Sequence, residues 1–141
     1  MSAGVAGAAD RNQAAKMQPD AALADSVRHA IVMYPRYSIF DDLYIQVTDG
    51  NVHLTGVVNQ PFKKSDIEKI VRSVAGDHQV IDDIRVLPLS PNDDRLRLRV
   101  ARSIYGDATM TKYAIQPLKP IHIVVENGHV TLTGVVCEQF R

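Results

Sequence analysis

Apolar side chains recur along the chain first at helical spacing and then at strand spacing. A first group fits one face of a helix: Leu23, Val27, Ala30, Ile31 and Tyr34. Pro35 follows and is expected to end that helix. Residues 43–47 then alternate apolar and polar, which indicates a strand buried on one face. Asp49-Gly50 is typical of a tight hairpin turn in which both residues have positive φ. The pattern therefore predicts a helix followed by a hairpin.

A second helix and a third strand are predicted after the hairpin. Ser65 and Glu68 have the spacing of a capping box, so we expect this helix to begin at Ser65. Its apolar stripe runs to residue 75, and Gly76 is placed to end it. Residues 80–86 read as one short strand. The prediction for this part is an α+β unit of order α-β-β-α-β, with two helices on one face of a three-stranded mixed sheet.

The hairpin sequence occurs twice. Asp49–Val58 recurs as Asn127–Val136, with seven of ten residues identical. The strand before it and the helix upstream also correspond, which indicates a duplicated unit. Four glycines repeat with the motif: Gly50 and Gly128 in the turns, Gly56 and Gly134 in the strands. A strand glycine marks a bulge or a close approach, here expected to be that of a helix.

The second copy stops after its hairpin. Only residues 137–141 follow Val136, so its second helix and third strand are missing. Five apolar side chains are then expected to be poorly covered: Ile121, Ile123, Val125, Val130 and Leu132. The cover could come from the first unit, from a strand of another chain or from residues beyond Arg141, and we favour a longer natural chain. We predict a flexible leader at 1–19, a first unit at 20–90 and an incomplete second unit at 91–141.

The order of these elements, with the motif D/N-G-x-V-x-L-x-G-x-V, resembles the BON domain family of bacterial osmotic-shock and nodulation proteins. The resemblance covers residues 20–136 and departs from the family at Asp77, where an apolar residue is usual. It implies a non-enzymatic module of the bacterial periplasm and cell envelope that contacts phospholipid surfaces and supports envelope integrity or stress tolerance. Other family members are cytoplasmic. The family has no catalytic residues to transfer.

Composition and candidate chemistry narrow the function further. The chain has 16 basic and 16 acidic residues, so its net charge is zero, which argues against nucleic acid as a partner.

The five histidines do not have the spacing of metal ligands, and we expect neither a metal nor a cofactor. In each of the adjacent pairs Asp41-Asp42 and Asp82-Asp83 the two side chains point to opposite faces of a strand, so neither pair is an acid–base dyad. Each pair is interpreted as a solvated strand end or turn. Cys137 has no histidine or basic partner close by in the sequence to activate its thiol, so we interpret it as a strand-end thiol rather than a nucleophile. We expect no enzyme.

Two groups of residues are candidates for contact with a membrane surface. Arg95, Arg99 and Arg102 share one face of the second unit's helix and would attract anionic headgroups. The loop 34–40 adds Arg36, Tyr37 and Phe40, which suit the headgroup boundary. The ordinary alternatives are a solvated helix face and aromatic side chains packed under the sheet. The alternative function is an assembly module that pairs with a protein partner or with itself through the uncovered second hairpin.

Overall fold

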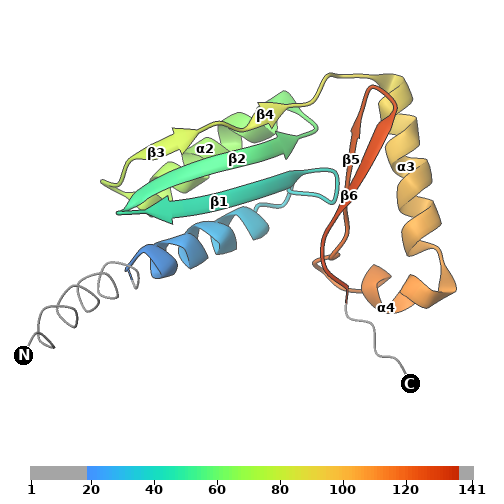
Figure 1. Ribbon diagram of the computed structural model, residues 1–141, viewed down its shortest axis with the longest axis horizontal. Coiled ribbons are helices and arrows are strands. Elements are labelled where there is room, and N and C mark those ends of the chain that lie inside the picture. The colour runs from blue at the N-terminus through green and yellow to red at the C-terminus, as the bar shows by residue number, and fades with distance from the viewer. Residues whose placement is uncertain (1–18, 137–141) are drawn as a thin grey trace, which may run out of the picture.

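The computed structural model describes residues 19–136. The first unit begins with a helix over residues 19–32, followed by β1 (Asp42–Thr48), β2 (Asn51–Val58), α2 (Pro61–Ala75), β3 (Val80–Asp82) and β4 (Arg85–Val86) (Figure 1). The second unit consists of α3 (Pro91–Tyr105), a short 3-10 turn at Ala108–Met110, α4 (Thr111–Ala114), β5 (His122–Glu126) and β6 (His129–Thr133). The mixed α+β class is confirmed.

The sheet of the first unit has the mixed strand directions that the sequence predicts. β1 pairs antiparallel with β2, whereas β3 and β4 both run parallel to β2. The expected single strand over 80–86 is in fact two short strands. The Asp82 carboxylate accepts a hydrogen bond from the Ile84 N–H at 3.0 Å. A side chain that bonds its own backbone two residues on favours a turn, which explains the break.

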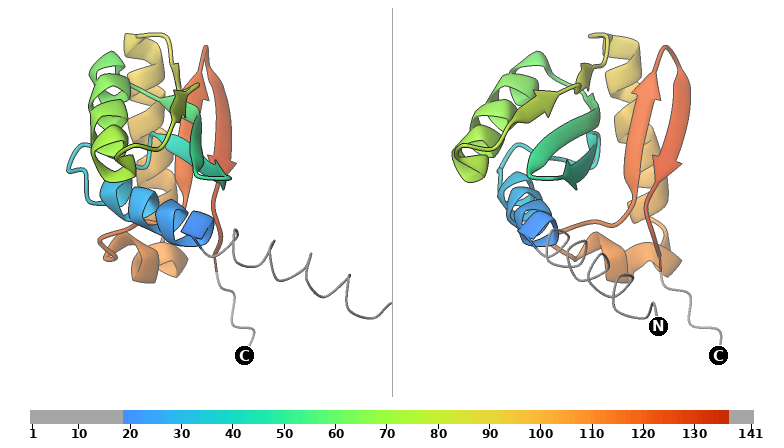
Figure 2. Two further views of the ribbon diagram at one scale, coloured as in Figure 1. Left: turned by 90° about the vertical axis from the view of Figure 1, so that its left-hand side faces the viewer. Right: turned by 60° about the vertical axis from the view of Figure 1, so that its left-hand side comes forward.

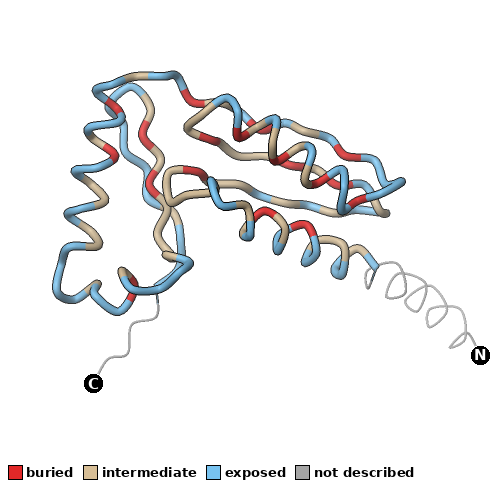
Figure 3. The backbone as a smooth tube through the Cα atoms, turned by 180° about the vertical axis from the view of Figure 1, so that it is seen from behind, coloured by how far each residue is buried: buried red, intermediate tan, exposed pale blue. Residues whose placement is uncertain are grey.

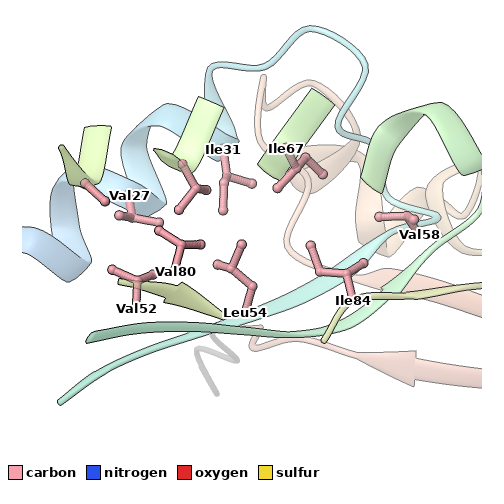
Figure 4. Packing of buried hydrophobic residues seen from close by; sticks show 10 residues of the cluster. Val27, Ile31, Val52, Leu54, Val58, Ile67, Val80 and Ile84 are labelled. Carbon is pink, nitrogen blue, oxygen red and sulfur yellow. The ribbon is translucent and has the colours of Figure 1, made fainter. Parts of the chain in front are cut away.

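The core of the first unit lies between its sheet and its two helices. Val27 and Ile31 of the first helix and Ile67 of α2 point toward the strands, as Figure 4 shows. The strand side chains that meet them include Val52 and Leu54, which are 0% and 1% exposed. Figure 3 shows the same pattern along the chain, with buried positions on the facing sides of the elements. The faces of the first helix and of α2 that contact the sheet are the apolar stripes predicted from the sequence.

The start of α2 differs from the prediction. The helix begins at Pro61, and its N-cap Gln60 makes no side-chain capping bond. Proline is pre-organised for the first helical position, where its missing N–H costs nothing. Ser65 therefore lies inside the helix, and Glu68 instead accepts hydrogen bonds from Arg72 at 2.9 and 3.0 Å. The end of the helix at Gly76, with φ of 60°, is confirmed.

The second unit is a helix packed on a two-stranded hairpin. β5 and β6 pair antiparallel, with Ile123 opposite Leu132 and Val125 opposite Val130. Figure 2 shows α3 lying along one side of this hairpin. The predicted helix and hairpin are thus present.

The expectation that this hairpin is poorly covered is correct for only one strand. Ile123 and Val125 of β5 are fully buried because α3 packs against β5. Val130 and Leu132 of β6 remain 41% and 52% exposed. The helix α3 is centred over β5 rather than over the middle of the pair, so the open part of the face lies over β6.

The two units meet at both ends of β5. The Ile123 N–H donates to the Ile39 carbonyl at 2.6 Å, and His122 Nδ1 donates to the Asp41 carbonyl at 2.6 Å. A two-pronged ion pair between Arg85 and Glu126, at 2.7 and 3.0 Å, joins β4 to β5. One backbone hydrogen bond, one hydrogen bond from a histidine side chain to the backbone and an ion pair therefore hold the hairpin across the end of the first unit.

Candidate functional site

The helix α3 presents the candidate arginines and is well specified at both ends. Ser90 caps it by accepting a hydrogen bond from the Asp93 N–H at 3.2 Å, and Pro91 occupies the first helical position. Asp93 and Asp94 place negative charge in the first turn, where the helix dipole favours it. Gly106 ends the helix. The arginines are thus displayed on a rigid element of fifteen residues.

Arg95, Arg99 and Arg102 are all exposed on α3. Their spacing of four and three residues puts them on one face, along about 10 Å of helix. Within the described residues 19–136, none of the three guanidinium groups forms a hydrogen bond or an ion pair. The three charges are therefore available to an anionic surface.

Arg97, the fourth arginine of α3, points the other way. It is only 3% exposed, and it donates to the Asp94 carboxylate at 2.6 Å and to the Val125 carbonyl at 2.7 Å. The sequence contained a signal for this, since position 97 lies at the edge of the apolar stripe formed by Leu96 and Val100. Its role is to hold α3 on β5.

Apolar side chains lie close to the arginine face. Leu98 is half exposed between Arg95 and Arg102, and it lines a hollow of about 410 Å³ together with Arg102 and Lys119. Ile115 and Leu118 of the segment after α4 are also strongly exposed, but Leu118 lines a separate hollow with residues of the first helix and β1. Cations bordered by apolar side chains are the mix that an interfacial surface needs. Sequence reasoning did not single out these apolar residues.

The loop 34–40 contributes less to an exposed surface than the sequence suggested. The Arg36 guanidinium is exposed and lies 5.1 Å from the centre of the Phe62 ring, a cation–π contact. Tyr37 and Phe40 are both partly buried. The centre of the Tyr37 ring lies 5.8 Å from that of the His122 ring, at the junction of the two units. Burial raises the pKa of the Tyr37 phenol to about 12. Ile39 of this loop lines the same hollow as Arg102 of α3.

Both hairpin turns are capped by an aspartate at the start of the preceding helix. The Asp20 carboxylate accepts the N–H groups of Asp49 and Gly50, each at 2.8 Å. The Asp93 carboxylate accepts those of Asn127 and Gly128, each at 2.9 Å. The repeat in the sequence did not reveal these caps, although Asp20 and Asp93 are 73 residues apart, the same separation as Leu23 and Leu96 in the two helix stripes.

The strand glycines allow close approach of a strand rather than of a helix, which corrects the prediction. Gly56 and Gly134 have φ of 107° and 133°. A Cβ atom on Gly56 would collide with the Asp42 carbonyl of β1, and one on Gly134 would collide with the Pro120 carbonyl. The turn glycines Gly50 and Gly128 have φ of 79° and 81°, as predicted.

The acidic pair Asp41-Asp42 is not a solvated strand end. Asp41 is fully buried and accepts a hydrogen bond from Lys63 Nζ at 2.7 Å. It also accepts the N–H groups of Ser38 and Asn59, at 3.0 and 2.9 Å. Nothing local to the pair indicates burial, because the partner cation is 22 residues away. This ion pair ties the loop before β1 to the start of α2.

Other chemistry is scarce in the part of the chain that the structure describes. No cluster of three or more histidine, cysteine, aspartate or glutamate side chains is found there that could hold a metal ion. His53 is paired with Asp83 at 2.6 Å. None of the described helices combines the length and apolar character required to cross a bilayer. Cys137 lies outside the described residues.

Comparison with known protein families identifies the first unit. The model of the BON domain matches residues 19–88, from the first helix to the end of β4. This family is associated with envelope and membrane-related roles, and its members are generally non-catalytic binding modules. The match does not extend to α3 or the second hairpin. No curated protein matches the chain.

Proposed function

We propose, from the premise that residues 19–88 are a BON domain, that this protein is a non-enzymatic module that contacts anionic phospholipid surfaces. The contact is made chiefly by Arg95, Arg99 and Arg102 of α3. In its biological setting the module acts at the bacterial envelope, in the periplasm, and supports envelope integrity or tolerance of osmotic stress.

The observation that carries the proposal is the arginine face of α3. Its three guanidinium groups are exposed and lack partners among the described residues, whereas Arg97 is used internally. An unpaired cationic stripe on a rigid helix has no role in holding this fold. The exposed side chain of Leu98 supplies apolar contact beside it.

The expected strength of this contact is modest. Each arginine near an anionic leaflet contributes about 1 kcal/mol, so the stripe contributes about 3 kcal/mol. That is reversible, salt-dependent binding rather than anchoring. Arg36 adds a further exposed cation on the first unit.

We further propose that the second unit is a BON-like copy of the first. The support is geometric: the same turn φ values, the same aspartate cap and the same strand glycine recur at corresponding positions. The lipid-binding helix α3 is then the counterpart of the first helix. The first helix has Ala22, Ser26 and His29 where α3 has its three exposed arginines, so the proposed specialisation belongs to the second unit.

Vesicle co-sedimentation of the full chain tests the lipid proposal. We expect binding to phosphatidylglycerol vesicles and little binding to phosphatidylcholine vesicles, with the difference reduced at high salt. The triple variant Arg95→Gln, Arg99→Gln and Arg102→Gln should lose about a hundredfold in affinity, the equivalent of about 3 kcal/mol.

A matched control separates position from net charge. The variant Arg28→Gln, Lys69→Gln and Arg72→Gln removes three exposed cations from the first unit and should bind nearly as the parent does. Equal losses in the two triple variants, or negligible binding of the parent to both kinds of vesicle, would refute the proposal.

A further inference from the structure

The open part of the second hairpin is a defined surface, here called the β6 face. It consists of the side chains of Val130, Leu132 and Val136 and of the outer backbone edge of β6. These three side chains are 41%, 52% and 42% exposed. Among the described residues, β5 is the only strand that pairs with β6.

The first unit shows what covers the corresponding surface. Val52, Leu54 and Val58 precede Val130, Leu132 and Val136 by 78 residues and are at most 1% exposed. Ile67 and Val71 of α2 belong to the buried cluster that encloses them. Figure 1 shows α2 lying behind the sheet formed by β2 and β3. The cover is therefore an amphipathic helix.

The backbone edge has a partner of the same kind in the first unit. On β2, the Val52 N–H donates to Gln79 at 2.8 Å, and the carbonyls of Leu54 and Val58 accept from Asp83 and Leu87, both at 2.9 Å. The equivalent groups on the β6 face are the Val130 N–H and the carbonyls of Leu132 and Val136. A row of unpaired backbone groups is a template for a parallel strand.

A third correspondence concerns the connection between helix and strand. In the first unit His78 of that connection packs on Gly50, whereas no atom of residues 19–136 lies within 4 Å of where a Cβ of Gly128 would be. Gly128 instead borders an open hollow of about 510 Å³ that Arg95 and Arg99 also line. Asp93 also lines this hollow, but its carboxylate is already bound by the Asn127 and Gly128 N–H groups. The two arginines leave the hollow net positive, which favours a connection that carries an acidic side chain, as Asp77 does in the first unit.

We propose that the β6 face binds a polypeptide segment made of an amphipathic helix, an acidic connection and a strand that pairs parallel with β6. The helix covers Val130, Leu132 and Val136, the strand takes the free edge, and the connection lies against Arg95 and Arg99, so that the segment and an anionic lipid surface compete for these two arginines. A bilayer does not fit this surface as well, since unpaired backbone groups are costly in hydrocarbon.

The probe is a synthetic peptide of residues 59–88, the helix–strand segment of the first unit, added to the ¹⁵N-labelled full chain. We expect amide exchange at Val130 and Leu132 to slow by about tenfold or more, as for newly paired strands. The same segment joined after Val136 is the stronger form of the test, because linkage raises its effective concentration. A segment carrying Ile67→Asp and Val71→Asp should have no effect in either form.

Matched variants of the full chain locate the effect. Leu132→Asp should abolish the response to the peptide, whereas Leu89→Asp, at another strongly exposed leucine, should leave it unchanged.

Unaltered amide exchange at residues 130–136 in the chain that carries the joined segment overturns the proposal. A dimer that forms with rising concentration and is dissociated by Leu132→Asp also overturns the proposal, because a second copy of the chain would then occupy the β6 face. Loss of vesicle binding in Leu132→Asp would make a bilayer the occupant, whereas failure of the lipid proposal alone leaves these results unaffected.

Discussion

The two hairpins of this protein have nearly the same backbone and very different surroundings. Asp49 and Asn127, the first turn residues, both have φ of 51°, and both turns are closed by an aspartate of the preceding helix. Leu54 is 1% exposed, whereas its counterpart Leu132 is 52% exposed. The comparison teaches that the hairpin conformation is a local property and that burial is supplied by whatever packs on it.

The buried ion pair marks a second difference between the units. Asp41 joins Lys63 in the first unit, and the position 78 residues later is Lys119 rather than an acid. The second unit therefore has no counterpart of this anchor at that position. The anchor connects the loop before β1 to α2, the element that only the first unit has among the described residues.

The largest effect is expected from breaking this anchor. Lys63→Met leaves the fully buried Asp41 carboxylate without its cation, which should lower the free energy of unfolding by about 3–5 kcal/mol. Urea unfolding followed by circular dichroism measures it. Lys69→Met, at an exposed position of the same helix, should change stability by less than about 0.5 kcal/mol. Similar values for the two variants would show that Asp41 does not need its partner.

The second-largest effect tests how differently the two hairpins are buried. Leu54→Ala should cost about 2–5 kcal/mol, because it opens a cavity in a closed core. Leu132→Ala should cost less than about 1 kcal/mol, because half of that side chain already contacts solvent. Thermal or urea unfolding of the two variants provides the comparison. Equal costs would mean that the β6 face is covered in solution.

The smallest effect tests what the hairpins share. Asp93→Ala and Asp20→Ala each remove a carboxylate that accepts two turn N–H groups. We expect a loss of about 2 kcal/mol for the buried Asp93 and about 1 kcal/mol for the more exposed Asp20. Exchange of the turn amides reports the local effect, with Asn92→Ala and Asp25→Ala as controls. Turn amides that stay protected in both variants would contradict the capping role.

Much of the local structure could be predicted because it depends on short-range chemistry. The Asp49-Gly50 and Asn127-Gly128 turns follow from residues that tolerate positive φ, and Gly76 ends α2 for the same reason. The strand spans follow from alternation of apolar residues. The start of α2 was placed wrongly because a capping pattern within the helix was preferred to Pro61 at its first position.

The candidate site was predictable only in part. Arg95, Arg99 and Arg102 share a face by spacing alone, and the structure leaves them exposed. Their role in lipid binding remains a prediction. The burial of Arg97 depends on the Val125 carbonyl, 28 residues away. Tyr37 likewise packs at a junction with His122 that a local pattern does not reveal.

By itself, the sequence determined the helices and the turns, because each depends on side chains within a few residues of one another. It also revealed the repeat, because the two copies keep the same residues at matching positions. The tertiary structure alone decided which apolar faces are closed and which charges are paired. Asp41 was matched with Lys63, α3 was placed on β5, and Val130 and Leu132 were left open to solvent. The reason is physical: burial and ion pairing depend on which distant segments come together in space, and residue spacing along the chain carries little information about that.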